Sequence, residues 1–128
     1  MHIDASVIVA ILANESDRAS LFDRMRTAGK STSPISVFEA SIALSALTGS
    51  CASALSEIMR FLTVADVEIL PVEADLLPEL CVARDRYGKG SGHPARLNLG
   101  DCVSYAMARK VGVPLLYKGN DFAQTDMA

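Results

Sequence analysis

The chain opens with the stretch Met1-His-Ile-Asp-Ala-Ser-Val-Ile-Val-Ala-Ile-Leu12, which decides the fold. Its first residues predict a short strand that ends at Asp4. The apolar run Ala5–Leu12 then predicts a helix, with Ser6 near its start. Strand–helix units of this kind build parallel sheets, and such sheets bind ligands beyond the carboxyl ends of their strands. Asp4 therefore stands where a functional site is expected.

The alternation of strands and helices continues along the chain. Further helices are predicted over residues 16–28, 34–47, 51–65, 73–87 and 98–111. Short strands are predicted over 67–71 and 113–117, and a brief strand or a turn over 30–33. Residues 88–96 form the least regular stretch, and residues 118–128 are mostly polar. This order predicts one domain, residues 1–128, with an α/β fold. We expect a three-layer α/β/α sandwich around a mostly parallel sheet of four to five strands.

The composition is that of a folded domain with an aliphatic core. Half of the 128 residues are hydrophobic and 5% are aromatic, which excludes a disordered chain. The formal net charge of −3 is unusual for a protein that binds nucleic acid. If four carboxylates bound metal, −3 plus 4 would leave +1 on the remaining surface. Net charge alone therefore neither supports nor excludes RNA as a ligand.

The cysteines and the N-terminus bear on where the protein works. Cys51, Cys81 and Cys102 are widely spaced and form no Cys/His metal motif, so we expect buried, reduced thiols. The N-terminus lacks the basic segment and apolar run of a signal peptide. No apolar stretch reaches the roughly 20 residues that span a bilayer. A cytoplasmic protein without a membrane partner is expected.

Glu39 is the acid that is hardest to explain by structure alone. It lies in the middle of a predicted helix, and most residues three and four positions away are apolar. No lysine or arginine between Pro34 and Leu47 could pair with it. Because charges are rarely buried without a partner or a metal, Glu39 indicates a cation site.

Three other acids fall at positions that also allow structural roles. Asp4 and Asp121 follow predicted strands, where Asp4 could cap a helix and Asp121 could serve a turn. Asp101 lies in the first turn of a helix, where it suits the helix dipole, although Asn98 already offers a cap. Asp126, five residues after Asp121, is close enough to share or replace its role. Clustered carboxylates stay ionised together only with a cation, and an all-oxygen site favours Mg²⁺ or Mn²⁺.

Four blocks of sequence carry a resemblance to a known family. They are Met1–Ser6, Ser36–Ala40, Leu97–Cys102 with Tyr105–Ala108, and Leu115–Phe122 with Thr125-Asp126. In this order they resemble the PIN-domain ribonucleases of the VapC toxin type. The resemblance implies a PIN-like nuclease fold and endonucleolytic cleavage of RNA with Mg²⁺ or Mn²⁺, as the toxin of a type II toxin–antitoxin pair.

The resemblance also implies roles for residues and partners. Asp4 and Asp101 match the principal metal ligands, and Glu39 and Asp121 match the other acidic positions. Supporting positions are matched by Ser6 and Asn98, with Asp126 as the competing fourth acid. The implied partners are a VapB-like antitoxin whose C-terminal segment covers the site, and a second copy in a homodimer. Two departures are His2, which replaces an aliphatic residue, and a final edge strand that is very short or absent.

The basic residues of the stretch 84–96 either guide RNA phosphates or form a solvated helix end. Single-stranded or looped RNA is the expected substrate, because its bases are accessible. The main alternative is a non-catalytic PIN-like module that docks an antitoxin or RNA. A receiver domain would need an acidic pair after the first strand, and a phosphatase an Asp-x-Asp motif. The segment Asp4-Ala5-Ser6 supplies neither.

Overall fold

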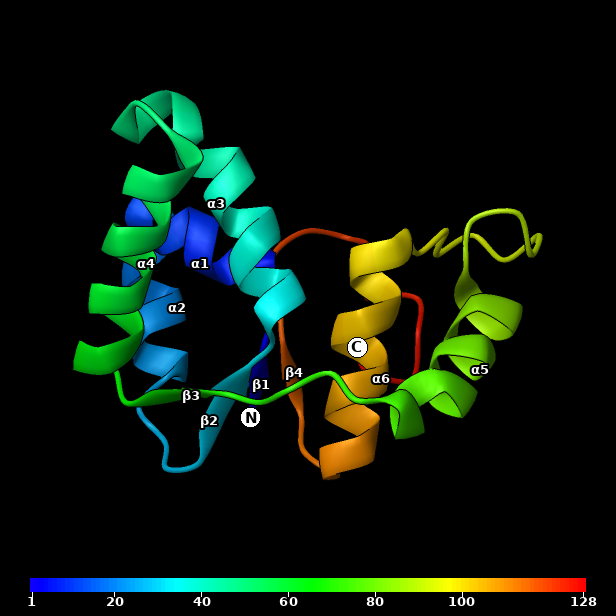
Figure 1. Ribbon diagram of the computed structural model, residues 1–128. Coiled ribbons are helices and arrows are strands. Elements are labelled where there is room, and N and C mark those ends of the chain that lie inside the picture. The colour runs from blue at the N-terminus through cyan, green and yellow to red at the C-terminus, as the bar shows by residue number, and fades with distance from the viewer.

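The computed structural model describes residues 1–128, in which helices flank a four-stranded parallel sheet (Figure 1). The strands are β1 (His2–Ile3), β2 (Lys30–Thr32), β3 (Val67–Ile69) and β4 (Leu115–Leu116), in the order β3-β2-β1-β4. Every neighbouring pair is parallel. The carboxyl ends of β1 and β4 therefore meet at one edge. The predicted α/β fold and its parallel sheet are confirmed, without a further edge strand.

Seven helical segments surround this sheet. They are α1 (Ala5–Leu12), α2 (Arg18–Arg24), α3 (Pro34–Thr48), α4 (Cys51–Val64), the 3₁₀ turn η1 (Ala74–Leu76), α5 (Leu77–Tyr87) and α6 (Leu99–Val111). The start of α3 follows the predicted signals: the Ser33 hydroxyl accepts from the Ser36 N–H at 3.1 Å, and Pro34 occupies the first turn. It ends at Gly49, whose φ of 98° is left-handed.

Two predicted helices differ from the observed ones. The segment expected over residues 16–28 is helical only from Arg18 to Arg24, and residues beyond it turn towards β2. The segment expected over residues 73–87 is divided into η1 and α5. Pro78 lacks a backbone N–H, which a helix tolerates in its first turn, so the regular helix begins beside it at Leu77.

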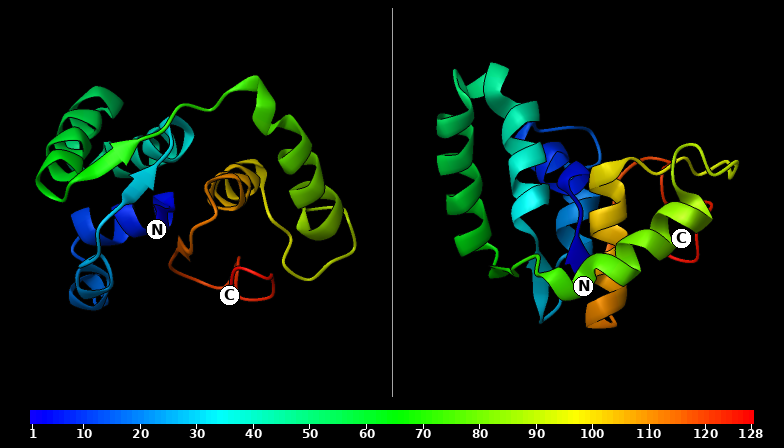
Figure 2. Two further views of the ribbon diagram at one scale, coloured as in Figure 1. Left: turned by 90° about the horizontal axis from the view of Figure 1, so that it is seen from below. Right: turned by 45° about the vertical axis from the view of Figure 1, so that its right-hand side comes forward.

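The core has two main parts, one on each side of the sheet (Figure 2). The larger part joins α1, α2, α3 and α4 through buried aliphatic side chains such as Ile8, Leu44 and Ile58. The smaller part joins α5, α6 and the C-terminal segment around Tyr105 and Phe122. Between them, the N-terminal halves of α3 and α6 approach each other, which places acids from distant segments close together.

His2 and the cysteines show where side chains depart from expectation. His2 is fully buried, and its Nδ1 lies 3.0 Å from the Ser31 hydroxyl, while Nε2 has no partner. All three cysteines are free, as expected. Only Cys102 is buried, however: Cys51, at the start of α4, and Cys81, on α5, are exposed. The expectation of buried thiols is therefore wrong for these two.

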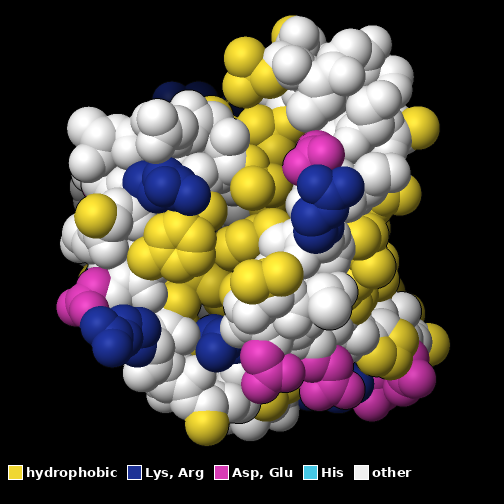
Figure 3. All heavy atoms as spheres, turned by 90° about the vertical axis from the view of Figure 1, so that its left-hand side faces the viewer, with side chains coloured by type: hydrophobic (Ala, Val, Ile, Leu, Met, Phe, Trp, Pro, Cys, Tyr) yellow, Lys and Arg dark blue, Asp and Glu magenta, His cyan; other side chains and the backbone are white.

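One face of the molecule exposes apolar side chains between basic ones (Figure 3). A groove between α2 and α4 is lined by Phe22, Phe61 and Val64, with Arg26 and Arg60 beside them. No single helix is long and apolar enough to cross a membrane. The pair α3–α4 reaches that length and composition only when taken together, and it is bent by 114° at its break.

Candidate metal centre

Asp4 lies at the carboxyl end of β1, where three donors hold its carboxylate. Its backbone N–H donates to the Leu116 carbonyl at 3.0 Å. Its Oδ2 accepts from the Ser6 backbone N–H at 2.9 Å and from the Ser6 hydroxyl at 2.6 Å. Oδ1 accepts from the Ser104 hydroxyl at 2.6 Å. The carboxylate therefore caps α1 and at the same time faces α6, so its helix-capping role does not exclude a role in the site.

Asp101 is 8% exposed and begins α6 in a reciprocal cap with Asn98. The Asp101 N–H donates to the Asn98 Oδ1 at 2.8 Å, and the Asn98 N–H donates to the Asp101 Oδ2 at 3.0 Å. Burial raises the pKa of the Asp101 carboxyl to about 6. The negative charges of Asp121 and Asp4 act in the same direction, and the hydrogen bond from the Asn98 backbone opposes them. The other carboxylate oxygen of Asp101 remains available to a ligand.

Glu39 projects from the N-terminal half of α3 onto the start of α6, where it packs against Gly100. A Cβ on Gly100 would lie 2.0 Å from the Glu39 Oε1 and 2.3 Å from Oε2. Burial raises the pKa of the Glu39 carboxyl to about 7, and the charges of Asp4 and Asp101 add to this effect. No basic side chain forms an ion pair with Glu39. Three acids, from the end of β1 and from the helices α3 and α6, thus influence one another within one site.

The two candidates for the fourth acid lie in different surroundings. Asp121 is exposed in the turn after β4, and its charge raises the pKa of Asp101. Asp126 instead accepts hydrogen bonds from the Tyr105 hydroxyl at 2.7 Å and from the Arg109 guanidinium at 3.0 Å. Asp126 is therefore occupied in an ion-pair network on the side of α5 and α6, and Asp121 is the acid that adjoins Asp101.

The donor set fits a divalent cation, although the side chains have not converged on one point. No group of three acidic, histidine or cysteine side chains stands at coordination distance. Asp4 and Asp101 direct oxygens towards hydroxyl and N–H donors instead. Like charges also separate when nothing neutralises them. Oxygen ligands that raise one another's pKa and lack a basic partner suit Mg²⁺ or Mn²⁺.

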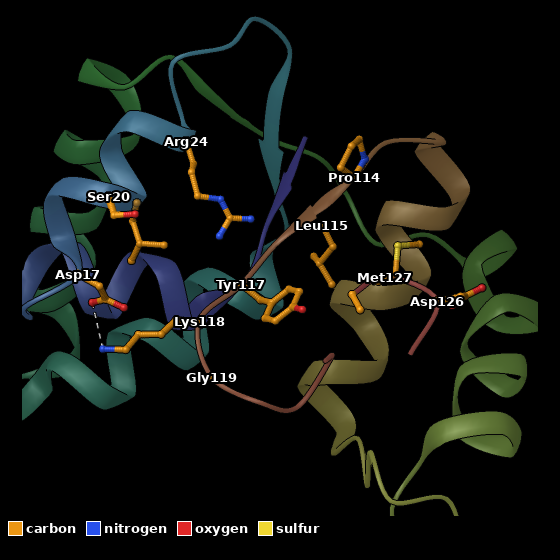
Figure 4. A pocket seen from close by; sticks show the side chains of 12 residues that line it. Asp17, Ser20, Arg24, Pro114, Leu115, Tyr117, Lys118, Gly119, Asp126 and Met127 are labelled. Carbon is orange, nitrogen blue, oxygen red and sulfur yellow. Dashed lines mark ion pairs between the residues drawn. The ribbon is translucent and has the colours of Figure 1, made fainter. Parts of the chain in front are cut away.

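The neighbouring lysine is turned away from the acids. The Lys118 ammonium pairs with Glu15, and with Asp17 at 3.1 Å, at the rim of a pocket beside β4 (Figure 4). Its backbone N–H donates to the Ser6 hydroxyl at 3.0 Å. Ser6 thus ties the segment after β4 to Asp4, while the charge of Lys118 is neutralised elsewhere. The negative charge of the acid site is left for a ligand to balance.

Two residues of this site were not predicted from the sequence. Gly100 admits the Glu39 carboxylate, and Ser104 fixes Asp4 from the facing helix. A faint signal was present, because Ser104 lies three residues after Asp101 and shares its helix face. The predicted residues Asp4, Glu39 and Asp101 are brought together, with Ser6 and Asn98 as their hydrogen-bond partners.

Comparison with known proteins identifies the family of this chain. A model of the PIN domain family matches residues 1–127. A VapC ribonuclease of Rhizobium meliloti is 40% identical over 141 residues, covering 98% of this chain and 97% of that protein. Ribonuclease VapC42 of Mycobacterium tuberculosis is 38% identical over 128 residues, covering 99% and 96%.

A solved structure shows the same fold. VapC20 of Mycobacterium tuberculosis, described as a sarcin–ricin loop cleaving toxin, superposes with a TM-score of 0.73 at 21% identity, covering 95% of this chain and 92% of its own. At that identity the likeness concerns the fold alone. The family model and the full-length relatives go further: this chain belongs to the PIN-domain family, among its VapC ribonucleases.

Proposed function

We propose that this chain is a metal-dependent endoribonuclease and the toxin of a type II toxin–antitoxin pair. The observation that carries the proposal is the Glu39 carboxylate, packed against Gly100 beside Asp101 and Asp4 without a basic partner. Relatives that span nearly the whole chain are named ribonucleases, which supports RNA as the substrate.

Asp4, Asp101 and Asp121 would hold the metal, and Glu39 would be a further ligand or orient the attacking water. Bound Mg²⁺ or Mn²⁺ supplies activation of water and stabilisation of negative charge at the phosphate. Ser6 and Ser104 keep the Asp4 carboxylate in place. The water is the nucleophile, so the RNA 2′-hydroxyl is not required. A substrate with a single 2′-deoxy substitution at the cut position is therefore expected to be cleaved.

The proposed partner is a VapB-like antitoxin whose C-terminal segment covers the acids. A similar fold occurs in a toxin–antitoxin complex from Klebsiella pneumoniae, with a TM-score of 0.72 at 14% identity. A basic side chain of the antitoxin would neutralise Glu39, Asp101 and Asp4. These acids repel one another, and no basic side chain of the chain itself forms an ion pair with them. We further propose that the toxin forms a homodimer in the cytoplasm.

The test uses the chain purified without antitoxin and an end-labelled single-stranded RNA. Discrete cleavage is expected with Mg²⁺ or Mn²⁺, with loss in EDTA and recovery when metal is returned. Asp4→Asn and Asp101→Asn should each lower the rate by at least about 100-fold, since each removes a charge from the metal site. The matched control Glu68→Gln alters an exposed acid on β3, outside the site, and should cleave normally.

Two outcomes would contradict the proposal. Cleavage that persists in EDTA or in both asparagine variants would exclude the metal mechanism. A chain that cleaves no RNA but binds its antitoxin tightly would be the non-catalytic PIN-like module.

A further inference from the structure

An apolar cavity of about 630 Å³ adjoins the acid site between α5 and α6. Its walls are mainly aliphatic, and Leu77 and Leu99 leave 60% and 82% of their surface in solvent. The cavity reaches Asn98, which forms two hydrogen bonds with Asp101. A ligand in the cavity would therefore lie beside a residue that holds one of the acids.

The rim of this cavity carries two cations that no carboxylate neutralises. Arg84 and Lys89 form no ion pair, whereas basic residues such as Lys110 and Lys118 do. The Arg84 guanidinium lies against the loop of residues 88–96, which follows α5: its Nη2 is 3.3 Å from where a Cβ on Gly90 would stand. Asp85 is the one acid that lines the cavity. An occupant with an apolar flat part and a negative group fits this combination.

We propose that the cavity is a nucleotide subsite for one unstacked base of the RNA strand next to the bond that is cut. The phosphate of that nucleotide lies between Arg84 and Lys89. The inference rests on the proposed function, because a strand whose phosphate lies at Asp101 reaches the cavity past Asn98, the hydrogen-bond partner of Asp101. No aromatic residue lines it, so the base is held between aliphatic side chains rather than by stacking. Single-stranded RNA meets this requirement, since its bases turn out freely.

Two exposed cysteines allow a test that does not depend on cleavage. Cys81 lines the cavity, and Cys51 lies on α4, outside it. The Asp4→Asn variant is treated with N-ethylmaleimide, with and without saturating single-stranded RNA, and alkylation is followed by peptide mass spectrometry. RNA is expected to slow alkylation of Cys81 about tenfold and to leave Cys51 unchanged. Equal rates at Cys81 with and without bound RNA would overturn the proposal.

Binding measurements with altered RNAs and variants test the contact with the base and the contact with the phosphate separately. RNAs in which one nucleotide at a time is abasic are bound to the same variant and measured by fluorescence anisotropy. One abasic position should weaken binding about fivefold to tenfold, near the low end for a base held by a protein. Adding Leu77→Ser and Leu99→Ser should abolish that sensitivity. The serine variant has already lost the apolar contact with the base, so removing the base costs no further binding energy. Leu47→Ser is the control, because this leucine of α3 has an exposed fraction between those of Leu77 and Leu99 and lies outside the cavity.

Lys89→Gln should weaken the binding of all RNAs alike. It should also lower the number of counterions released on binding, read from the salt dependence, by about one. Three results would overturn the proposed subsite. The first is that an abasic position still weakens binding after both serine substitutions, and the second is that Lys89→Gln leaves the salt dependence of binding unchanged. The third is that alkylation of Cys81 is slow at high protein concentration without RNA. The last would show that a second copy covers the cavity. If Asp4→Asn still cleaves RNA, the proposed mechanism fails, and Cys81 protection still reports on the subsite.

Discussion

At the scale of single residues, Glu39 shows how a site for a cation weakens the fold that carries it. Its carboxyl has a pKa raised from 4.5 to about 7, so the folded chain loses stability as the pH rises between these values, and the loss is complete above pH 7. In EDTA at pH 8, Glu39→Gln should raise the free energy of unfolding by about 1 kcal/mol, after allowance for partial exposure. RNA cleavage should fall by at least about 100-fold with metal present. Urea unfolding tests the change in stability, and a cleavage assay tests the change in activity. A Glu39→Gln variant that is less stable and still active would contradict the assignment of Glu39 to the metal site.

His2 provides a pH dependence of the opposite kind. Burial lowers its pKa from 6.5 to about 4, so between these values the unfolded chain binds a proton that the folded chain does not. The free energy of unfolding should therefore fall by about 3 kcal/mol as pH drops through this window. His2→Val removes this loss and also the unpartnered Nε2. Urea unfolding in EDTA at several pH values should show the two proteins diverging below pH 6.5, and parallel curves would exclude His2 as the cause.

At the scale of elements, Gly100 is the contact that lets α6 approach α3. Gly100→Ala would place a methyl group within 2.0 Å of the Glu39 Oε1, so the carboxylate must move and cleavage should fall at least about tenfold. Stability should drop by about 1–3 kcal/mol, as for other overpacked sites. The double variant Gly100→Ala with Glu39→Ala relieves the clash and should regain stability but not activity. Additive losses in thermal unfolding would show that the two residues do not meet.

Local sequence signals account for most elements, because caps and proline positions act within one turn of chain. The Ser33-Pro34 start of α3, its end at Gly49 and the Asn98 cap of α6 are signals of this kind. The site is only partly predictable. Positions after strands identify Asp4 and Asp121, but the contact of Gly100 with Glu39 joins segments 61 residues apart and leaves no local pattern. Likewise, helix periodicity over residues 73–87 does not show where η1 ends and α5 begins.

At the scale of the whole molecule, large apolar side chains remain exposed on several faces, among them Leu47, Val64 and Leu99. Apolar surface of this kind is typical of proteins that bind partners. The groove between α2 and α4 lies apart from the acid site and from the cavity between α5 and α6, which adjoins that site. The surface that we propose for RNA therefore leaves this groove free for a partner.

One acid, Asp126, links the C-terminal segment to two helices, in addition to the buried Phe122. Asp126 joins it to α6 through the Tyr105 hydroxyl and Arg109, and to α5 through Arg86 at 3.8 Å. Burial and this hydrogen bond raise the pKa of Tyr105 to about 12. Asp126→Asn should lower the free energy of unfolding by about 1 kcal/mol, because these pairs are partly exposed, and should speed proteolysis of the C-terminal segment.

Asp121→Asn is the matched comparison, since Asp121 is exposed, makes no ion pair and adjoins Asp101. It should leave urea unfolding in EDTA within about 0.5 kcal/mol of the parent chain, as surface substitutions usually do. RNA cleavage should fall at least about tenfold, and more Mg²⁺ should be needed for half-maximal rate. Asp126→Asn should show the reverse pattern, with an unchanged Mg²⁺ requirement. If instead Asp126→Asn raised the Mg²⁺ requirement and Asp121→Asn did not, Asp126 would be the fourth acid of the metal site.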